Sequence, residues 1–325
     1  MTMDLSIIVP LFNEEENVHL MHQAIVDAVR PLGLRTEILF VDDGSRDATF
    51  ARCLEMQRAL PPVAEGEPHL RLVKLRRNYG QTAAMAAGIE QARGRVLITM
   101  DGDLQNDPGD IPLFLEKIEE GYDLVVGWRH QRKDHWSRVL PSKVANWLIG
   151  KITGVPIKDN GCSLKAYRAD LIKEIPLYAE MHRFIPAMAS LGGASIAEIK
   201  VRHHPRRFGQ SKYGFSRIYK VFADLITIRT ILSFARRPMV WLGGAAGLAG
   251  LAGLAALVAA LTFIDDPRSS GVVFQGLSML FGALMFFMLF LGFLCQLIYG
   301  VRAPRLHAFR RLAARPVLTG TDGAA

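Results

Sequence analysis

Two long apolar segments near the end of the sequence constrain its fold more than any other feature. Residues 239–264 and 272–301 each exceed the ~20 residues that a helix needs to cross the hydrocarbon core of a bilayer. The short polar stretch DDPRSS, residues 265–270, separates them. The two segments are therefore predicted to form a transmembrane hairpin spanning residues 239–301.

Arginines flank this hairpin on both sides. Arg236 and Arg237 precede the first segment, and the second is followed by Arg302, Arg305, Arg310 and Arg311. The positive-inside rule then places both flanks, both termini and the preceding domain in the cytoplasm. This predicts a multi-pass protein of the inner (plasma) membrane with a basic cytoplasmic tail, residues 302–325. Gly243 and Gly247 form a small-xxx-small pattern that fits either close helix packing or a lipid-facing surface.

Residues 214–238, just before the hairpin, have an amphipathic pattern. Their basic side includes Arg217 and Lys220, together with Asp224, and the opposite apolar side consists of Ile218, Val221, Phe222, Leu225, Ile228 and Leu232. This pattern favours a helix lying in the membrane interface. An ordinary soluble amphipathic helix is the alternative.

The N-terminal domain, residues 1–213, alternates short apolar runs with segments of helical periodicity. Residues 5–12, 36–45, 70–78 and 95–101 read as strands, and residues 13–32, 46–60 and 80–93 read as helices, the first with acidic residues in its first turn. This order predicts an α/β fold with a mostly parallel, Rossmann-like sheet. Ligands of such sheets bind beyond the carboxyl ends of the strands, where we expect Asn13, Asp42, Asp43, Asn78, Asp101 and Asp103.

Asp101 and Asp103 directly follow a buried strand in the stretch RVLITMDGDLQNDP. Two carboxylates at one crowded site repel each other unless a cation or a proton lies between them. A hard divalent cation takes oxygen ligands and shares them with substrate phosphates, which favours a metal site here over an acid/base pair or a solvated turn. Gln105 could add an oxygen ligand, whereas Asp107 is expected to cap a helix that begins at Pro108.

The composition narrows the classes of partner. A net charge of +8 favours anionic partners. Nucleic acid is not expected, because the basic residues cluster beside the apolar segments and no nucleic-acid motif is present. No Gly-x-Gly-x-x-Gly follows the first strand, which disfavours a nicotinamide enzyme. The cysteines form no metal-type pair and no disulfide framework, which fits a reducing compartment, and the N-terminus does not read as a secretory signal.

Six motifs together carry a resemblance. SIIVPLFNEEENV, FVDDGSRDAT, RNYGQTAAMAAGI, MDGDLQNDP, VVGWR and DNGCSLKAYR occur in this order. As a set, over about residues 4–215, they resemble the family 2 glycosyltransferases of GT-A fold. More narrowly, they are similar to polyprenyl-phosphate glycosyltransferases, which include dolichyl-phosphate mannose synthases and bacterial undecaprenyl-phosphate enzymes with such a hairpin.

The resemblance implies a role for each matching residue. Nucleotide binding falls to Pro10, Asn13, Glu14, Asp42, Asp43 and Asp101, with Asn78 at the same edge of the sheet. A divalent Mg²⁺ or Mn²⁺ is assigned to Asp101, Asp103 and Gln105. The acceptor phosphate is assigned to Arg129, Arg138, Ser142, Arg206 and Lys212. Catalysis is assigned to Asp103, Arg129 and Asp159, with Asp159 near the sugar and acceptor as a base or a positioning group.

The predicted function is inverting transfer of a sugar from a nucleotide sugar to polyprenyl phosphate at the cytoplasmic membrane face, for cell-envelope glycosylation. The resemblance to UDP-sugar users makes UDP-glucose the first candidate donor, and it implies a homotetramer. A GDP-mannose-dependent mannose synthase is the alternative donor assignment. A non-catalytic membrane scaffold or lipid carrier is the alternative of another class, and the acidic residues argue against it. A processive polysaccharide synthase is disfavoured because no Gln-x-x-Arg-Trp motif is present.

Overall fold

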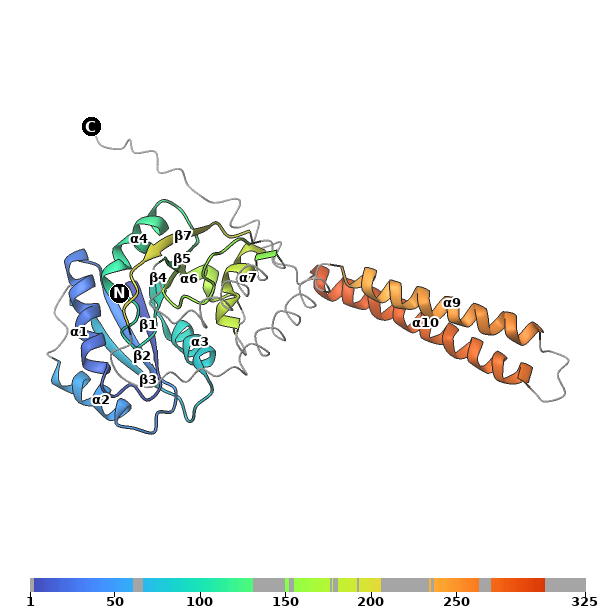
Figure 1. Ribbon diagram of the computed structural model, residues 1–325, viewed down its shortest axis with the longest axis horizontal. Helices are drawn as coiled ribbons and strands as arrows, with labels where there is room; N and C mark the ends of the chain where they lie inside the picture. The colour runs from blue at the N-terminus through green and yellow to red at the C-terminus, as the bar shows by residue number, and fades with distance from the viewer. Residues whose placement is uncertain are drawn as a thin grey trace, which may run out of the picture. The chain divides into compact units, whose positions relative to one another are not determined.

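The chain divides into two compact units, residues 1–225 and 226–325. A computed structural model describes residues 3–60, 67–130, 150–151, 155–175, 177, 181–191, 193–205, 234, 237–262 and 270–301 (Figure 1). The boundary between the units falls within the predicted juxtamembrane region. Most of that region, including the predicted interfacial helix, lies outside the described residues, so its structure stays a prediction.

A mixed sheet forms the centre of the first unit (Figure 1). It has seven strands in the order β3-β2-β1-β4-β6-β5-β7. All neighbours pair in parallel except β6, which is antiparallel to both β4 and β5. The strands are β1 (Met3–Leu11), β2 (Thr36–Asp42), β3 (His69–Lys74), β4 (Gly94–Thr99), β5 (Leu124–Arg129), β6 (Lys165–Arg168) and β7 (Ile196–Val201). The predicted α/β class with a mostly parallel sheet is confirmed.

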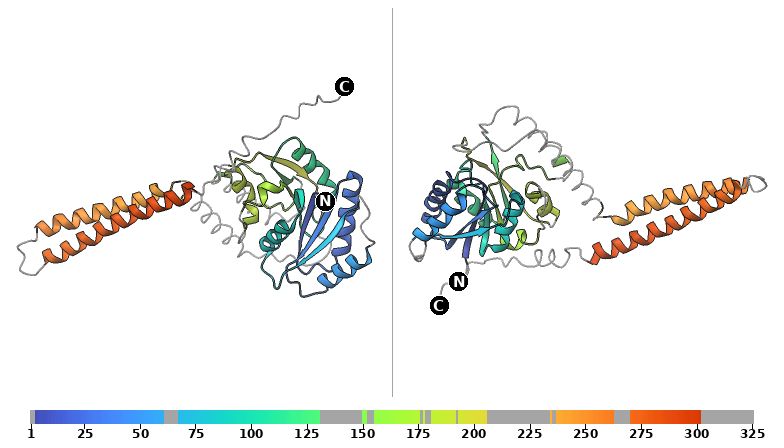
Figure 2. Two further views of the ribbon diagram at one scale, coloured as in Figure 1. Left: turned by 180° about the vertical axis from the view of Figure 1, so that it is seen from behind. Right: turned by 90° about the horizontal axis from the view of Figure 1, so that it is seen from below.

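Helices cover both faces of this sheet (Figure 2). The α-helices are α1 (Val18–Val29), α2 (Thr49–Ala59), α3 (Gln81–Gln91), α4 (Ile111–Glu119), α6 (Ala169–Ile172) and α7 (Ile185–Leu191), and the short 3₁₀ turns are η1 (Arg30–Leu32), η2 (Pro108–Asp110) and η3 (Met181–Arg183). Successive strand residues point to opposite faces, so Ile7 packs with α1, α2 and α4, whereas Ile8 packs with α3, α6 and α7. Both strand faces are therefore apolar, as a sheet buried on both sides requires.

The first helix begins later than its sequence pattern predicted. Helix α1 starts at Val18 and has no acidic residue in its first turn. The acidic residues occupy the preceding turn, where Glu14 accepts a hydrogen bond from the Asn17 side chain at 2.6 Å. Glu15 there accepts from the Ala48 N–H at 3.1 Å. Side chains of this kind compete with the helix for backbone partners, and here they fix the loop after β1 instead.

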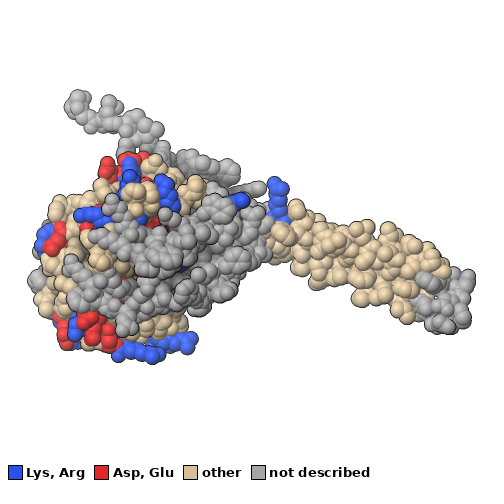
Figure 3. Space-filling view, in the orientation of Figure 1, with Lys and Arg blue, Asp and Glu red and all other residues tan. Residues whose placement is uncertain are grey.

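The second unit contains the two helices expected from the apolar segments, α9 (Pro238–Thr262) and α10 (Ser270–Val301). Both are long and apolar enough to cross a membrane. Large apolar side chains lie on their surfaces, such as Leu248 (71% exposed) and Met279 (77% exposed). Figure 3 shows their described surface without charged side chains. Such a surface fits lipid better than water.

Glycines set the contact between these two helices. A Cβ at Gly250 or Gly253 would meet Met285 or Phe281 of α10, so the small residues there allow close approach. A Cβ at Gly243 or Gly247 would meet nothing within 4 Å. Of the two interpretations of the Gly243/Gly247 pattern, packing against α10 is therefore excluded for these two glycines.

Candidate active site

Asp42 ends β2 at the carboxyl edge of the sheet and is only 2% exposed. Its Oδ1 accepts a hydrogen bond from the Ser45 N–H at 3.2 Å. Its buried Oδ2 has no hydrogen-bond partner in the part of the chain that the structure describes. Buried carboxylate oxygens are seldom left without a donor, so this atom marks a place where a ligand N–H or O–H would be stabilised.

Asp43 ties two loops together. Its Oδ1 accepts from the Tyr79 N–H at 2.8 Å and its Oδ2 from the Gly80 N–H at 2.9 Å. Burial raises the pKa of Asp43 and the neighbouring Asp42 charge adds to this, although the two amide donors oppose the shift. Asp43 therefore holds the loop that contains the exposed Asn78 against the end of β2.

Asn13 and Glu14 tie the loop after β1 to the loop after β2. The Asn13 side chain accepts from the Arg46 N–H at 2.9 Å, and its own N–H donates to Ser45 Oγ at 2.9 Å. Asn13 also has φ = 53°, the left-handed region that non-glycine residues seldom adopt. Pro10 pairs with Val41 in the sheet below these loops. The predicted nucleotide-binding residues of β1 and β2 are thus brought to one edge; their binding role stays a prediction.

Asp101 and Asp103 lie in the loop that leaves the carboxyl end of β4. Gln81, the first residue of α3, donates its Nε2 to Asp101 Oδ1 at 2.6 Å. Asp103 is 7% exposed and accepts from the Gln105 N–H at 3.1 Å. Leu104, between Asp103 and Gln105, has φ = 59° and is the second residue with a left-handed conformation at this edge. Such conformations cost energy and cluster at functional sites.

The donor set here fits a divalent cation that shares its ligands with a substrate. Among the described residues, no group of three or more His, Cys, Asp or Glu side chains could hold a metal ion. The side-chain oxygens at this site are those of Asp101, Asp103 and Gln105, and the Gln105 side chain makes no hydrogen bond within the described residues. Mg²⁺ is commonly bound by one or two carboxylates, waters and substrate phosphates, and this set suits that arrangement.

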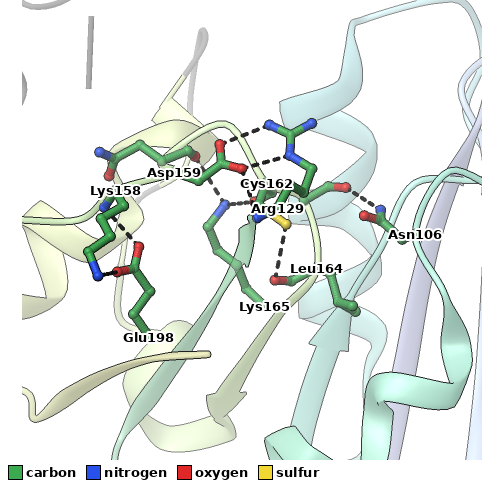
Figure 4. A network of polar contacts seen from close by, with 10 residues as sticks. Asn106, Arg129, Lys158, Asp159, Cys162, Leu164, Lys165 and Glu198 are labelled. Carbon is green, nitrogen blue, oxygen red and sulfur yellow. Dashed lines mark hydrogen bonds and ion pairs between the residues drawn. The ribbon is translucent and has the colours of Figure 1, made fainter. Parts of the chain in front are cut away.

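Arg129 and Asp159 form a buried bidentate ion pair (Figure 4). Arg129, the last residue of β5, donates Nε to Asp159 Oδ2 at 2.7 Å and Nη2 to Asp159 Oδ1 at 2.9 Å. The side chains are 14% and 4% exposed. Burial opposes the guanidinium charge, but the Asp159 hydrogen bonds and charge outweigh it and raise the pKa of Arg129. Arg129 Nη1 makes no hydrogen bond within the described residues.

A clamp formed by Arg202 and His204 holds the segment after Gln105. Arg202 donates Nε to Asp110 Oδ1 at 2.8 Å and lies 3.1 Å from Asp107, to which His204 is also paired at 3.1 Å. The His204 N–H donates to the Gln105 carbonyl at 2.9 Å. Asp107 also accepts from the Gly109 N–H, which confirms its predicted capping role. The end of β7 thus supports the loop that carries Asp103.

Four predicted acceptor-site residues lie outside the described residues: Arg138, Ser142, Arg206 and Lys212. The structure therefore brings together part of the predicted set. Strands β4 and β5 run in the same direction, so Asp101 after β4 and Arg129 at the end of β5 lie at the same edge of the sheet.

The sequence patterns did not identify two further residues of this region. Gln81 fixes Asp101, and Lys165 is a 1% exposed lysine at the start of β6. Periodicity offers no signal for Gln81, because its role depends on a contact made across the fold. Lys165 did leave one, since it is the single charged residue in the run CSLKAY, residues 162–167. A lysine at a buried strand position is uncommon and identifies a candidate for a special role.

Comparison with known proteins identifies the family of this chain. Residues 6–175 match the family Glycosyl transferase family 2. The chain belongs to this family of glycosyltransferases. It is also 46% identical over 246 residues to the dodecaprenyl-phosphate galacturonate synthase of Rhizobium johnstonii, an alignment that covers 74% of this chain and 71% of the relative.

Solved structures establish the fold of this glycosyltransferase as GT-A. The glucosyl-3-phosphoglycerate synthase of Mycobacterium tuberculosis in complex with phosphoglyceric acid superposes with a TM-score of 0.52 at 16% identity, covering 69% of this chain and 79% of that one. The same enzyme with Mn²⁺, UDP and glucosyl-3-phosphoglycerate gives 0.51 at 15% identity, covering 70% and 79%. At such identity the likeness concerns the fold alone.

Proposed function

We propose that this glycosyltransferase moves a sugar from a nucleotide sugar to a polyprenyl phosphate at a membrane surface. The observation that carries the proposal is that Asp101, which follows β4, and the Arg129–Asp159 pair at the end of β5 lie at the same carboxyl edge of the sheet. An acidic, metal-compatible loop suits a donor diphosphate, and an arginine suits an acceptor phosphate. The apolar helices α9 and α10 and the named activity of the Rhizobium relative support a lipid-linked acceptor.

On the donor side, the unpaired Asp42 Oδ2 would accept a hydrogen bond from the base or ribose. Pro10, Asn13, Glu14, Asp43 and Asn78 would form the rest of the nucleotide-binding site. Asp101, Asp103 and Gln105 would hold Mg²⁺ or Mn²⁺ against the diphosphate. When bound, this ion would neutralise charge on the departing nucleoside diphosphate.

On the acceptor side, a phosphate oxygen of the lipid attacks the anomeric carbon while the bond from that carbon to the diphosphate oxygen breaks. This single displacement inverts the anomeric configuration. A phosphate monoester carries about −1.5 to −2 charge near pH 7, so the nucleophile needs no strong general base. Both Asp159 oxygens already accept from Arg129, which favours Asp159 as a positioning group rather than a base. Arg129 Nη1 would contact the phosphate.

A UDP-sugar is the preferred donor class, with galacturonate and glucose as the first candidates. The relative named above makes a galacturonate-linked lipid, and the structural neighbours bind UDP or UDP-glucose. GDP-mannose remains the alternative donor. We also retain, as proposals, a cytoplasmic catalytic face, a multi-pass topology, acceptor contacts from Arg138, Ser142, Arg206 and Lys212, and a homotetramer.

The test uses the purified full-length chain in detergent or nanodiscs, with polyprenyl phosphate, Mg²⁺ or Mn²⁺, and UDP-galacturonate, UDP-glucose or GDP-mannose. The expected product is a polyprenyl phosphate whose mass increases by one sugar residue, formed with only some of these donors. Asp103→Asn serves as the matched inactive control. A protein that binds the lipid but gives no donor-dependent product would instead be a lipid carrier or scaffold.

A further inference from the structure

Lys165 places a positive charge in the core of the glycosyltransferase domain. It is the first residue of β6, is 1% exposed, and lies opposite Thr99 of β4 and Val126 of β5. Burying an ammonium group is costly unless its N–H groups find acceptors and its charge finds counter-charges. The contacts of this side chain therefore indicate why a lysine occupies the position.

The Lys165 ammonium donates hydrogen bonds to the turn that contains Asp159 (Figure 4). Its Nζ donates to the carbonyl of Cys162 and, at 3.3 Å, to the carbonyl of Asn160. The same turn is closed by the Cys162 N–H, which donates to the Asp159 carbonyl at 3.3 Å. Lys165 thus holds the interior side of the turn, while the Asp159 side chain is held by Arg129.

The charges around Lys165 come from three segments. Asp159 and Cys162 belong to the turn, Arg129 to β5, and Asp101 to the loop after β4. Burial raises the pKa of the Cys162 thiol to about 11, so this group is neutral near pH 7. Burial lowers the pKa of Lys165 to about 8, which leaves the ammonium mostly charged at pH 7. Two carboxylates and one guanidinium therefore surround a buried cation.

We propose that Lys165 is a positioning residue for sugar transfer, whose ammonium fixes the Asp159 turn and thereby aims the Arg129 guanidinium at the acceptor phosphate. This inference rests on the proposed function. It predicts that Lys165 affects the acceptor step and not donor affinity, because the residues that shape the predicted nucleotide pocket are tied together by other contacts. A misplaced reactive group costs up to about a hundredfold in rate.

Lys165→Met removes the charge at similar length, and Lys165→Arg retains it. We expect K165M to lower kcat by about tenfold to a hundredfold while the KM for the nucleotide sugar changes by less than about twofold. K165R should retain most of the activity. The matched control is Lys173→Met, because Lys173 also donates to a backbone carbonyl, that of Ala92 at 2.6 Å, away from Asp159; K173M should leave both constants unchanged.

A pH profile and hydrogen exchange separate positioning from general loss of structure. Wild-type kcat should fall with a midpoint near pH 8, and K165R should move this fall to higher pH. Backbone exchange in residues 159–164 should accelerate in K165M and not in K173M. If K165M does not fold, the inference is tested by whether the fall of kcat occurs at higher pH in K165R than in the wild type.

The inference would be overturned if K165M had the same kcat as the wild type and the same backbone hydrogen exchange in residues 159–164. An equal loss of donor affinity and kcat with global unfolding would do the same, since Lys165 would then act on stability alone. If the wild type forms no glycolipid, the proposed function is wrong, and the exchange of residues 159–164 still decides whether Lys165 holds this turn.

Discussion

The buried Arg129–Asp159 pair makes a quantitative prediction. Asp159→Asn keeps the shape of the side chain and removes its charge, which leaves the 14% exposed guanidinium without its counter-ion. Removing one partner of a buried ion pair typically costs 3–5 kcal/mol, or about 2–4 times RT ln 10. We expect about 3 kcal/mol here, because Asn still accepts one hydrogen bond and Arg129 retains some contact with water.

A double-mutant cycle isolates this interaction. The free energy of unfolding of the glycosyltransferase unit would be measured in denaturant for wild type, D159N, R129M and the double variant. Tryptophan fluorescence is a suitable signal, because Trp128 adjoins Arg129 in β5. The double variant should be destabilised by about 2 kcal/mol less than the sum of the single variants, since each single variant leaves an unpaired group.

A surface pair provides the control for this cycle. Arg35 and Asp4 lie 3.1 Å apart but are 48% and 19% exposed, so their coupling should be about 0–1 kcal/mol. A coupling at Arg129–Asp159 no larger than that of the control would refute the reasoning, because the pair would then contribute no more than a solvated contact.

Three further predictions concern single carboxylates. D103N should lower sugar transfer by about a hundredfold, measured against added Mg²⁺ and Mn²⁺, and wild-type turnover would exclude a metal role. D42N should raise the KM for the nucleotide sugar by about tenfold, because it removes a charged hydrogen-bond acceptor. Although burial opposes the shift, hydrogen bonds from Ser6, the Arg93 N–H and Arg71 lower the pKa of the buried Glu37 below 4.5. E37Q should therefore destabilise the domain near pH 7, and its difference from wild type should disappear as the pH falls through the lowered pKa, as denaturation at each pH will measure.

The strand ends could be predicted because hydrophobic periodicity specifies buried strands and the parallel order specifies which ends meet. Asp42, Asp101 and Arg129 accordingly reach one edge of the sheet. The apolar segments were equally predictable, since length and composition suffice for helices of that kind. The start of α1 could not be predicted in this way, because the side chains of Glu14 and Glu15 bind Asn17 and the Ala48 N–H instead of the first turn of the helix.

Pairings made across the fold could not be derived from periodicity. The Arg129–Asp159 ion pair joins residues 30 positions apart, and Gln81 of α3 reaches Asp101 in the loop after β4. Residue patterns report which face of an element is apolar, but they do not report which polar side chain on that face finds which partner. The order β4-β6-β5, with β6 antiparallel, is the same kind of long-range fact, and it is what places Lys165 below the Asp159 turn.

The Arg129–Asp159 ion pair has a net charge near zero, and this affects how the site can bind an acceptor phosphate. Because Asp159 cancels most of the guanidinium charge, Arg129 would orient a phosphate through Nη1, which has no partner among the described residues, more than it would attract the phosphate by net charge. Lys165 adds one buried positive charge nearby, but the Asp101 carboxylate opposes it. An anionic lipid headgroup therefore needs further positive charge at this edge, which the proposed donor-bound divalent cation would supply. On this reasoning, acceptor affinity should depend on the metal and the nucleotide sugar being bound first, so that donor and acceptor bind in order.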